Sequence, residues 1–154
     1  MKRGKKQKQK NAPQAWVVTV DMGYGHQRAT WPLQDMAADG EILVANDYEG
    51  IPGRDKFIWK NSRRMYETVS RIKKVPWIGE KIFNLMDEQQ QIPWFYPRRD
   101  LSEPTGQVRQ YYWAMRRLGW GRHLINYLNA KPLPLVTSFP VTAFMAEFFG
   151  FKKE

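Results

Sequence analysis

The chain has 154 residues, of which 42% are hydrophobic and 14% aromatic, so it can form one domain with a buried core and is too short for two. This composition excludes a disordered chain, and no apolar run approaches the roughly 20 residues that a membrane-spanning helix needs. The sequence contains no cysteine, which excludes disulfides and thiolate zinc sites and fits a reducing cytoplasm.

The net charge of +10 is distributed unevenly along the chain. Six basic residues lie among the first ten, which leaves only +4 on the other 144 residues. Residues 1–14 therefore read as a disordered basic tail that could touch anionic surfaces, although a merely solubilising or incidental tail is the favoured interpretation. We expect the folded domain to occupy residues 15–154.

The first folded segment has the pattern of a strand, a turn, a helix and a second strand. Residues 15–21 are apolar and β-branched and are followed by Gly23 and Gly25, which predicts a buried strand of a parallel sheet. Residues 41–47 predict the second strand. This order is typical of the opening βαβ unit of a doubly wound sheet.

The helix between these strands is expected within residues 26–38. Thr30 could cap it, because its hydroxyl can accept a hydrogen bond from a free backbone N–H. Pro32 suits a first turn, where a missing N–H costs little, and Gly40 would end the helix.

The remaining chain predicts further helices and one strand. We expect a helix over residues 57–73 with Ile58, Met65, Val69 and Ile72 on its apolar face, and a shorter one over residues 78–89. Three prolines make residues 92–104 irregular. The last elements are helices over residues 105–129, interrupted at Gly119-Trp120-Gly121, and 141–149, ended by Gly150, with a strand over residues 133–139.

These elements predict an α/β fold, a Rossmann-like parallel sheet flanked by helices. Three strands make a thin sheet, and the last helix would lead back to a fourth strand. We therefore expect an incomplete domain, truncated before its remaining strands.

The loop Gly23-Tyr24-Gly25-His26 lies where the first strand turns into a helix. Its glycines permit a tight turn, with a positive φ expected at Gly25, and the N–H groups at the helix start favour an anion such as phosphate. Arg28 stands where a dinucleotide-binding fingerprint needs glycine or alanine, and the lysine of a P-loop is missing. An ordinary βα turn with a structural histidine remains the alternative.

His26 follows the carboxyl end of the first strand, the edge at which open α/β sheets bind ligands. An imidazole suits proton transfer near neutral pH. Asp21, five residues earlier, could orient or charge-stabilise this histidine. The other histidine, His123, is far away in sequence and reads as a surface residue, so we predict no metal site.

Residues 21–29, Asp-Met-Gly-Tyr-Gly-His-Gln-Arg-Ala, resemble the Asp-x-Gly-x-Gly-His start of the glycosyltransferases that make monogalactosyl- and diglucosyl-diacylglycerol. More distantly, they resemble the peptidoglycan enzyme that adds N-acetylglucosamine to lipid I. Residues 131–140 resemble a later Lys-Pro-Asp-strand-Ser-x-His-Pro element of the lipid galactosyltransferases, with Ser138 and Pro140 matching. Phe139 replaces the histidine of that element, so the role of that histidine is not carried over.

This resemblance spans residues 15–150 and implies the N-terminal, acceptor-holding half of a two-domain GT-B fold. It implies inverting transfer of a hexose from a uridine-diphosphate sugar to a lipid or membrane-associated acceptor. His26 would activate or position the acceptor, with Asp21 beside it. The acceptor or phosphate loop would comprise Gly23, Tyr24, Gly25, Ser138 and Pro140.

The donor domain that the resemblance implies is not in this sequence. We therefore expect the chain alone to bind no cofactor and to be inactive, since the sugar nucleotide would bind to the missing C-terminal domain. The resemblance implies a cytoplasmic protein, peripheral on the inner face of the membrane.

A basic and aromatic segment occupies the middle of the chain. Residues 54–74 contain eight basic residues and two acidic ones, and tryptophans lie among them or shortly after them. A helix at an anionic bilayer surface has this composition, which indicates a membrane-surface group of Trp59, Arg63, Arg64 and Arg71. A satellite core with cations on its outside is an equal alternative. Single-stranded nucleic acid is third, since no recognised binding motif accompanies the pattern.

The sequence therefore allows a second class of function as an alternative to half of a glycosyltransferase. The chain could be a non-catalytic basic and aromatic module that binds an anionic membrane surface or nucleic acid.

Reversing the charges of Arg63, Arg64 and Arg71 together is expected to weaken binding to anionic vesicles, most strongly at low salt, where charges are least screened. Co-sedimentation with vesicles measures this. Unchanged co-sedimentation would remove the membrane-surface interpretation.

Overall fold

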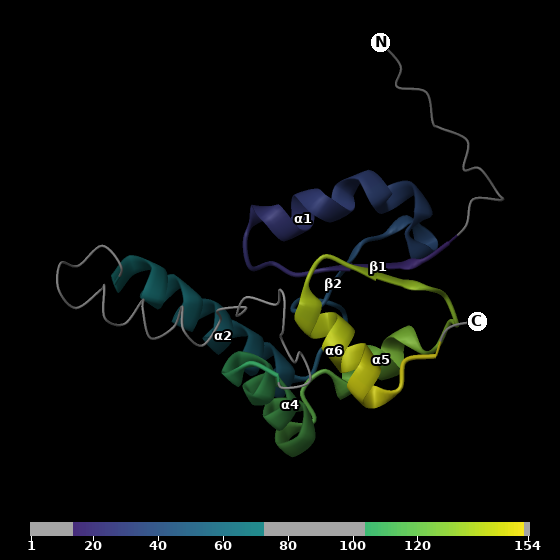
Figure 1. The fold of residues 1–154 in the computed structure, drawn as a ribbon. Coiled ribbons are helices and arrows are strands. Elements are labelled where there is room, and N and C mark those ends of the chain that lie inside the picture. Colours follow the sequence, from purple (N-terminus) through teal and green to yellow (C-terminus); the bar gives the residue numbers. More distant parts are fainter. Residues whose placement is uncertain (1–13, 73–103, 153–154) are drawn as a thin grey trace, which may run out of the picture.

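The computed structural model describes residues 14–72 and 104–152 (Figure 1). The elements in chain order are β1 (Trp16–Thr19), α1 (Tyr24–Thr30), the 3-10 turns η1 (Trp31–Met36) and η2 (Ala38–Gly40), β2 (Leu43–Val44), α2 (Gly53–Ile72), α4 (Gly106–Leu118), α5 (Arg122–Leu128), β3 (Leu135–Thr137) and α6 (Pro140–Phe149). The predictions for residues 1–13, 78–89 and 92–103 lie outside the described residues.

The three strands form one parallel sheet in the order β2-β1-β3. Val18 is in register with Leu43 of β2 and with Thr137 of β3. Both connections between parallel strands contain helices, as parallel pairing requires. The predicted α/β, Rossmann-like arrangement of a parallel sheet flanked by helices is therefore confirmed.

Strand β1 is the centre of the sheet and is buried on both faces. Val17, Val18 and Val20 are at most 1% exposed. Trp16, Val18 and Val20 belong to the main hydrophobic cluster, as expected for alternate side chains on one face of a strand. A strand with no solvent-facing side requires cover on both faces.

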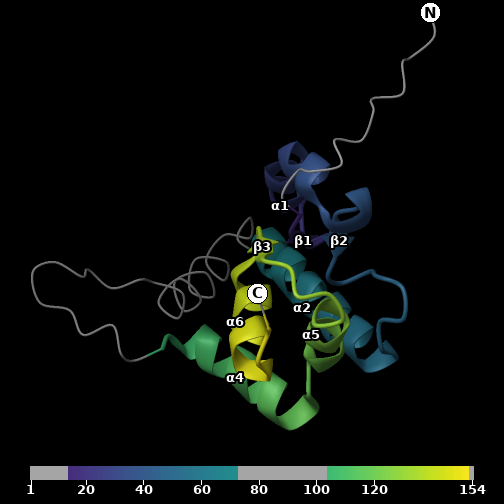
Figure 2. The same cartoon turned by 90° about the vertical axis from the view of Figure 1, so that its right-hand side faces the viewer.

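Two layers of helix provide that cover. Helix α1 lies on one face of the sheet, and α2, α4, α5 and α6 gather on the other, in both views (Figures 1 and 2). The larger core lies on this second side, where β1 packs against buried residues of the helices and of the turn between α4 and α5: Trp59, Met115, Trp120, Leu124, Ile125, Leu128, Val141 and Met145. No helix in residues 14–72 or 104–152 is long and apolar enough to cross a membrane.

The break between α4 and α5 falls where the glycines predict it. Gly119 and Gly121 have φ values of 65° and 88°, which side-chain-bearing residues rarely adopt. Between them, Trp120 is 2% exposed and packs its ring edge-on against Trp59 at 4.8 Å between centroids. Thr105 caps α4 by accepting from the N–H of Val108, and Gly150 ends α6 in a left-handed conformation.

Several boundaries differ from the sequence predictions. The strands are shorter than expected, because only the residues that pair with β1 form a ladder. Helix α1 begins at Tyr24, so His26 lies in its first turn and Gly25 is helical. The positive φ expected at Gly25 belongs to Gly23, with φ 129°. Thr30 does not cap a helix with its side chain, since its hydroxyl donates to the carbonyl of Gln27 at 2.9 Å.

Helix α2 also begins earlier than expected, at Gly53, and its predicted apolar face is confirmed at one position and wrong at another, the side chains of Val69 and Ile72 lying outside the described part. Met65 is 60% exposed, although Ile58 does pack at the edge of the core. The residues that face inward are Trp59 and Asp55, 3% and 2% exposed. Asp55 is buried because its Oδ2 accepts a hydrogen bond from the N–H of Gly121 at 3.1 Å.

A side chain at position 121 has no room. A Cβ on Gly121 would overlap the Met145 side chain, and the backbone there has a positive φ. Gly121→Ala is therefore expected to lower the free energy of unfolding by about 2–4 kcal/mol, from overpacking and backbone strain together. Gly25→Ala is the control, since that helical glycine has nothing near its Cβ position and should be neutral or slightly stabilising. Denaturant unfolding of both variants measures this; equal stabilities would contradict it.

Candidate functional site

The candidate site lies at the carboxyl ends of the strands. The chain runs from β1 to β2, which pairs with one edge of β1, and later returns to β3, which pairs with the other edge of β1. The edge between the ends of β1 and β3 is therefore the switch point at which open α/β sheets bind ligands. The loops that meet there follow β1, β2 and β3.

His26 is held at this edge by β3. Its Nδ1 lies 2.9 Å from the backbone carbonyl oxygen of Ser138. A carbonyl oxygen can only accept, so Nδ1 carries the proton and donates. In the neutral imidazole, Nε2 then has the free lone pair, and no group in the described part of the chain is bonded to it. The ring of Phe139 meets the imidazole edge-on at 5.1 Å between centroids.

Ser138 is itself fixed by β1. Its N–H donates to the carbonyl of Val18 at 3.2 Å, and its hydroxyl lies 3.2 Å from that of Thr19. The serine predicted to belong to the acceptor or phosphate loop therefore positions His26 through its carbonyl. Pro140 occupies the start of α6 and is exposed.

Asp21 lies in a different network from His26. Its carboxylate accepts from Arg63 Nη1 at 2.8 Å and more weakly from Gln27 Nε2 at 3.4 Å. The expectation that Asp21 orients His26 is therefore not what the geometry shows. His26, in the first turn of α1, contacts the end of β3, whereas Asp21 is engaged by α2.

The backbone of Asp21 is bound to the loop after β2. Its N–H donates to Asn46 Oδ1 at 2.8 Å, and Asn46 Nδ2 donates back to its carbonyl at 3.2 Å. Arg63 Nη1 also donates to this carbonyl at 3.1 Å. Asp21 thus ties together the ends of β1 and β2 and the middle of α2.

The residues of the predicted membrane-surface group lie in different environments in the structure. Trp59 is buried in the core, so its assignment to a membrane surface is wrong. Arg63 is braced between Asp21 and Glu67, and its hydrogen bonds to Glu67 and then Asp21 raise its pKa, so it is charged at any physiological pH. Arg64 is exposed. The side chain of Arg71 lies outside the described part.

The remaining predicted site residues, Gly23, Tyr24 and Gly25, lie in the glycine loop and are exposed to solvent. Gly23 precedes α1 and turns the chain with its positive φ, and Tyr24 is 77% exposed beside it. Among the described residues, no group of histidines and acids could hold a metal ion. The chemistry that the site can offer is proton transfer at His26 Nε2.

Two contributors to the site, Asn46 and Gln27, were not predicted from the sequence, and a third, Arg63, was predicted for a different role. Asn46 follows the second predicted strand, and its place at the shared carboxyl edge was a usable signal. Gln27 sits beside His26 in the motif. Arg63 was singled out for its charge, but no local pattern shows that it reaches a strand end 42 residues away.

Replacing Asn46 should loosen this edge. Asn46→Ala removes both hydrogen bonds to Asp21 and leaves a partly buried N–H unsatisfied, so the free energy of unfolding should fall by about 1–3 kcal/mol. Thermal melts measure this. The matched control is Asn61→Ala on the exposed face of α2, which should change stability by less than about 0.5 kcal/mol. Equal effects would show that the Asn46 contacts contribute little.

Comparisons of the chain with models of known families, with curated proteins and with solved structures gave no match. The fold and the contacts at the strand ends are therefore the observations on which a function can be proposed.

Proposed function

We propose that this chain is the acceptor-binding half of an inverting glycosyltransferase of GT-B type. In this role it binds a lipid or membrane-associated acceptor, which receives a hexose from a uridine-diphosphate sugar held by a second domain. His26 removes the proton from the acceptor hydroxyl. The chain alone has no transfer activity under this proposal, because it does not hold the donor.

The observation that carries the proposal is the state of the His26 ring. The Ser138 carbonyl holds Nδ1 in its protonated form, which leaves Nε2 as the proton acceptor. A general base needs this arrangement, in which one ring nitrogen is oriented by a fixed partner while the other is free to accept a proton.

The loop around His26 supports an acceptor site in two further ways. Tyr24 is 77% exposed and offers an acceptor both an apolar ring and a hydroxyl group. Asp21 has its charge balanced by Arg63, so it does not compete with a hydroxyl for His26. The partial match to the lipid glycosyltransferase motifs points to the same loop.

A second candidate, a non-catalytic module for an anionic membrane surface, is favoured by one observation. Helix α2 exposes Phe57, Arg64 and Met65, so apolar and basic side chains meet solvent without Trp59. This combination is typical of helices that lie on a bilayer surface. Two results together would favour this second candidate. Vesicle binding would persist when His26 is replaced, and the chain would show no sugar transfer when combined with any donor domain.

Removing the imidazole tests the proposed reaction. In a protein that joins this chain to its donor domain, His26→Gln should lower turnover by about 10²–10⁴-fold, the usual contribution of a general base. Sugar transfer to diacylglycerol from several uridine-diphosphate sugars measures this, with thermal melts to show that the variant folds. Turnover near that of the unaltered protein would reduce His26 to a structural turn residue.

Which nitrogen of the His26 ring carries the proton can be tested in this chain without a donor domain. Nitrogen NMR of the imidazole should show a protonated Nδ1 and an unprotonated Nε2 above the pH at which the ring loses its extra proton. The opposite tautomer would contradict the proton-acceptor role.

A further inference from the structure

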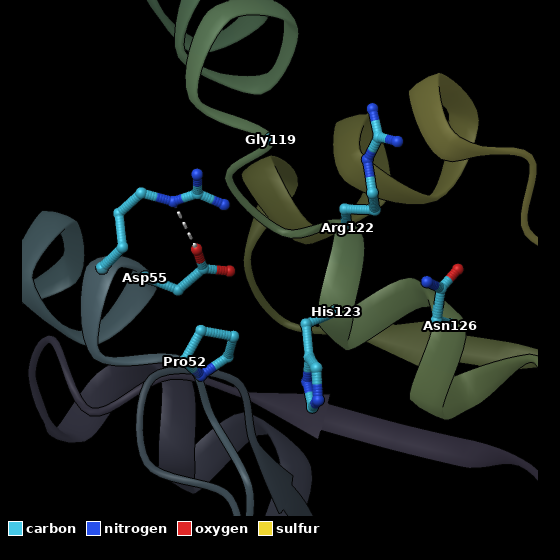
Figure 3. Close-up of a pocket in the computed structure, with 7 residues that line it drawn as sticks. Pro52, Asp55, Gly119, Arg122, His123 and Asn126 are labelled. Carbon is cyan, nitrogen blue, oxygen red and sulfur yellow. Dashed lines mark ion pairs between the residues drawn. The ribbon is translucent and has the colours of Figure 1, made fainter.

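A cavity separate from the His26 site lies between the start of α2 and the turn that joins α4 to α5 (Figure 3). Its volume is about 230 Å³, and none of its lining residues belongs to the His26 site. The side chains that matter for its chemistry come from two short stretches of chain: Arg54 and Asp55 on α2, and Arg122, His123 and Asn126 on α5.

Two arginines border the same point of this cavity. Arg54 Nη2 and Arg122 Nε lie 3.4 and 3.9 Å from the position that a Cβ of Gly119 would occupy. Gly119 has a positive φ and carries no side chain to separate them. Two guanidinium groups held beside one glycine repel each other unless an anion lies between or beside them.

The one carboxylate of the cavity balances only one of these two positive charges. Asp55 is 2% exposed, and its Oδ2 is occupied by the N–H of Gly121. Its Oδ1 has no hydrogen-bond partner and lies 3.7 Å from Arg54 Nε (Figure 3). Asp55 therefore holds Arg54 at ion-pair distance and leaves the outer edge of that guanidinium for a ligand. The Arg122 guanidinium packs over the Phe149 ring, and its Nε side, near Gly119, is the part that a ligand can meet.

His123 also lines the cavity, but its ring points away from the Arg122 guanidinium and toward Tyr48 (Figure 3). Its Nδ1 lies 2.8 Å from the hydroxyl of Tyr48, and the two rings are stacked. Burial, and then the charge of Asp55, raise the pKa of Tyr48, so its phenol stays protonated and can donate to Nδ1. In that arrangement the proton of the neutral imidazole is on Nε2. Asn126 is exposed at the rim, where its amide can also donate.

We propose that this cavity is a binding site for a phosphoryl group, held by Arg54 and Arg122 with Asn126 at the rim. Guanidinium groups bind phosphate oxygens in pairs of parallel hydrogen bonds, and the buried carboxylate fixes one of them in advance. The cavity accepts a phosphate with a small substituent. This site does not depend on the function proposed for His26, whose residues it does not share.

Inorganic phosphate, titrated calorimetrically into the full chain at low salt, is the first probe. Arg122→Gln should weaken its binding by about 10- to 100-fold, the usual contribution of a charge-assisted hydrogen bond. The matched control is Arg117→Gln, which removes the same charge from an exposed position on α4 and should leave the affinity unchanged. Equal losses in both variants would show only general attraction to a basic protein and would overturn the proposal.

A second variant avoids any loss of packing around Arg122, whose guanidinium lies over Phe149. Asn126→Asp keeps the shape of an exposed side chain and adds a negative charge at the rim, so it should also weaken phosphate binding at least tenfold. Asn61→Asp, exposed on α2, is its control. Unchanged binding in Asn126→Asp, or no saturable binding by the unaltered chain to any of the probes, would refute the site.

The source of the phosphoryl group is decided by comparing three probes. Binding of inorganic phosphate and glycerol phosphate, both lost in Arg122→Gln, would identify a site for small soluble phosphates. Binding only to phosphatidylglycerol vesicles, lost in Arg122→Gln but kept in Arg117→Gln, would identify a lipid headgroup site. Vesicle binding that both variants keep, without binding of either soluble phosphate, would count against the cavity.

Discussion

The burial of β1 on both faces is the constraint on which the rest of the structure depends. Its valines are inaccessible to solvent, and both of its edges are hydrogen-bonded to neighbouring strands. A strand in this position needs helices above and below it, and parallel neighbours need helical crossovers to reach it. The same arrangement brings the ends of three strands to one edge, so the loop after β1 meets residues from β2 and β3.

The contacts at that edge are mostly between backbone and side chain. The Ser138 carbonyl orients His26, and Asn46 brackets the backbone of Asp21. Such contacts depend on the register of the sheet, because a shift of one residue would move each partner away. The geometry of the proposed base is therefore a consequence of how β1 pairs with β3, and the glycine motif alone does not create it.

Helix α2 connects the core with both candidate sites. Asp55, Trp59 and Arg63 are spaced four residues apart, so they lie along one stripe of the helix. The first reaches the turn between α4 and α5, the second packs against Trp120, and the third reaches the end of β1. The composition of this helix predicts a membrane-facing surface. In the structure, the stripe of Asp55, Trp59 and Arg63 contacts the rest of the domain, and Phe57, Arg64 and Met65 are exposed.

The sequence by itself determined the parallel α/β architecture, the glycine break before α5 and the ends of α4 and α6, because hydrophobic periodicity, β-branched runs and left-handed glycines act within a few residues. It also singled out His26 and Ser138, which flank strand ends. Only the tertiary structure decided that Ser138 sets the tautomer of His26, that Asp21 pairs with Arg63, and that Arg54 and Arg122 meet at Gly119. These contacts join residues far apart in the chain, and they form only when packing and strand register bring the elements together.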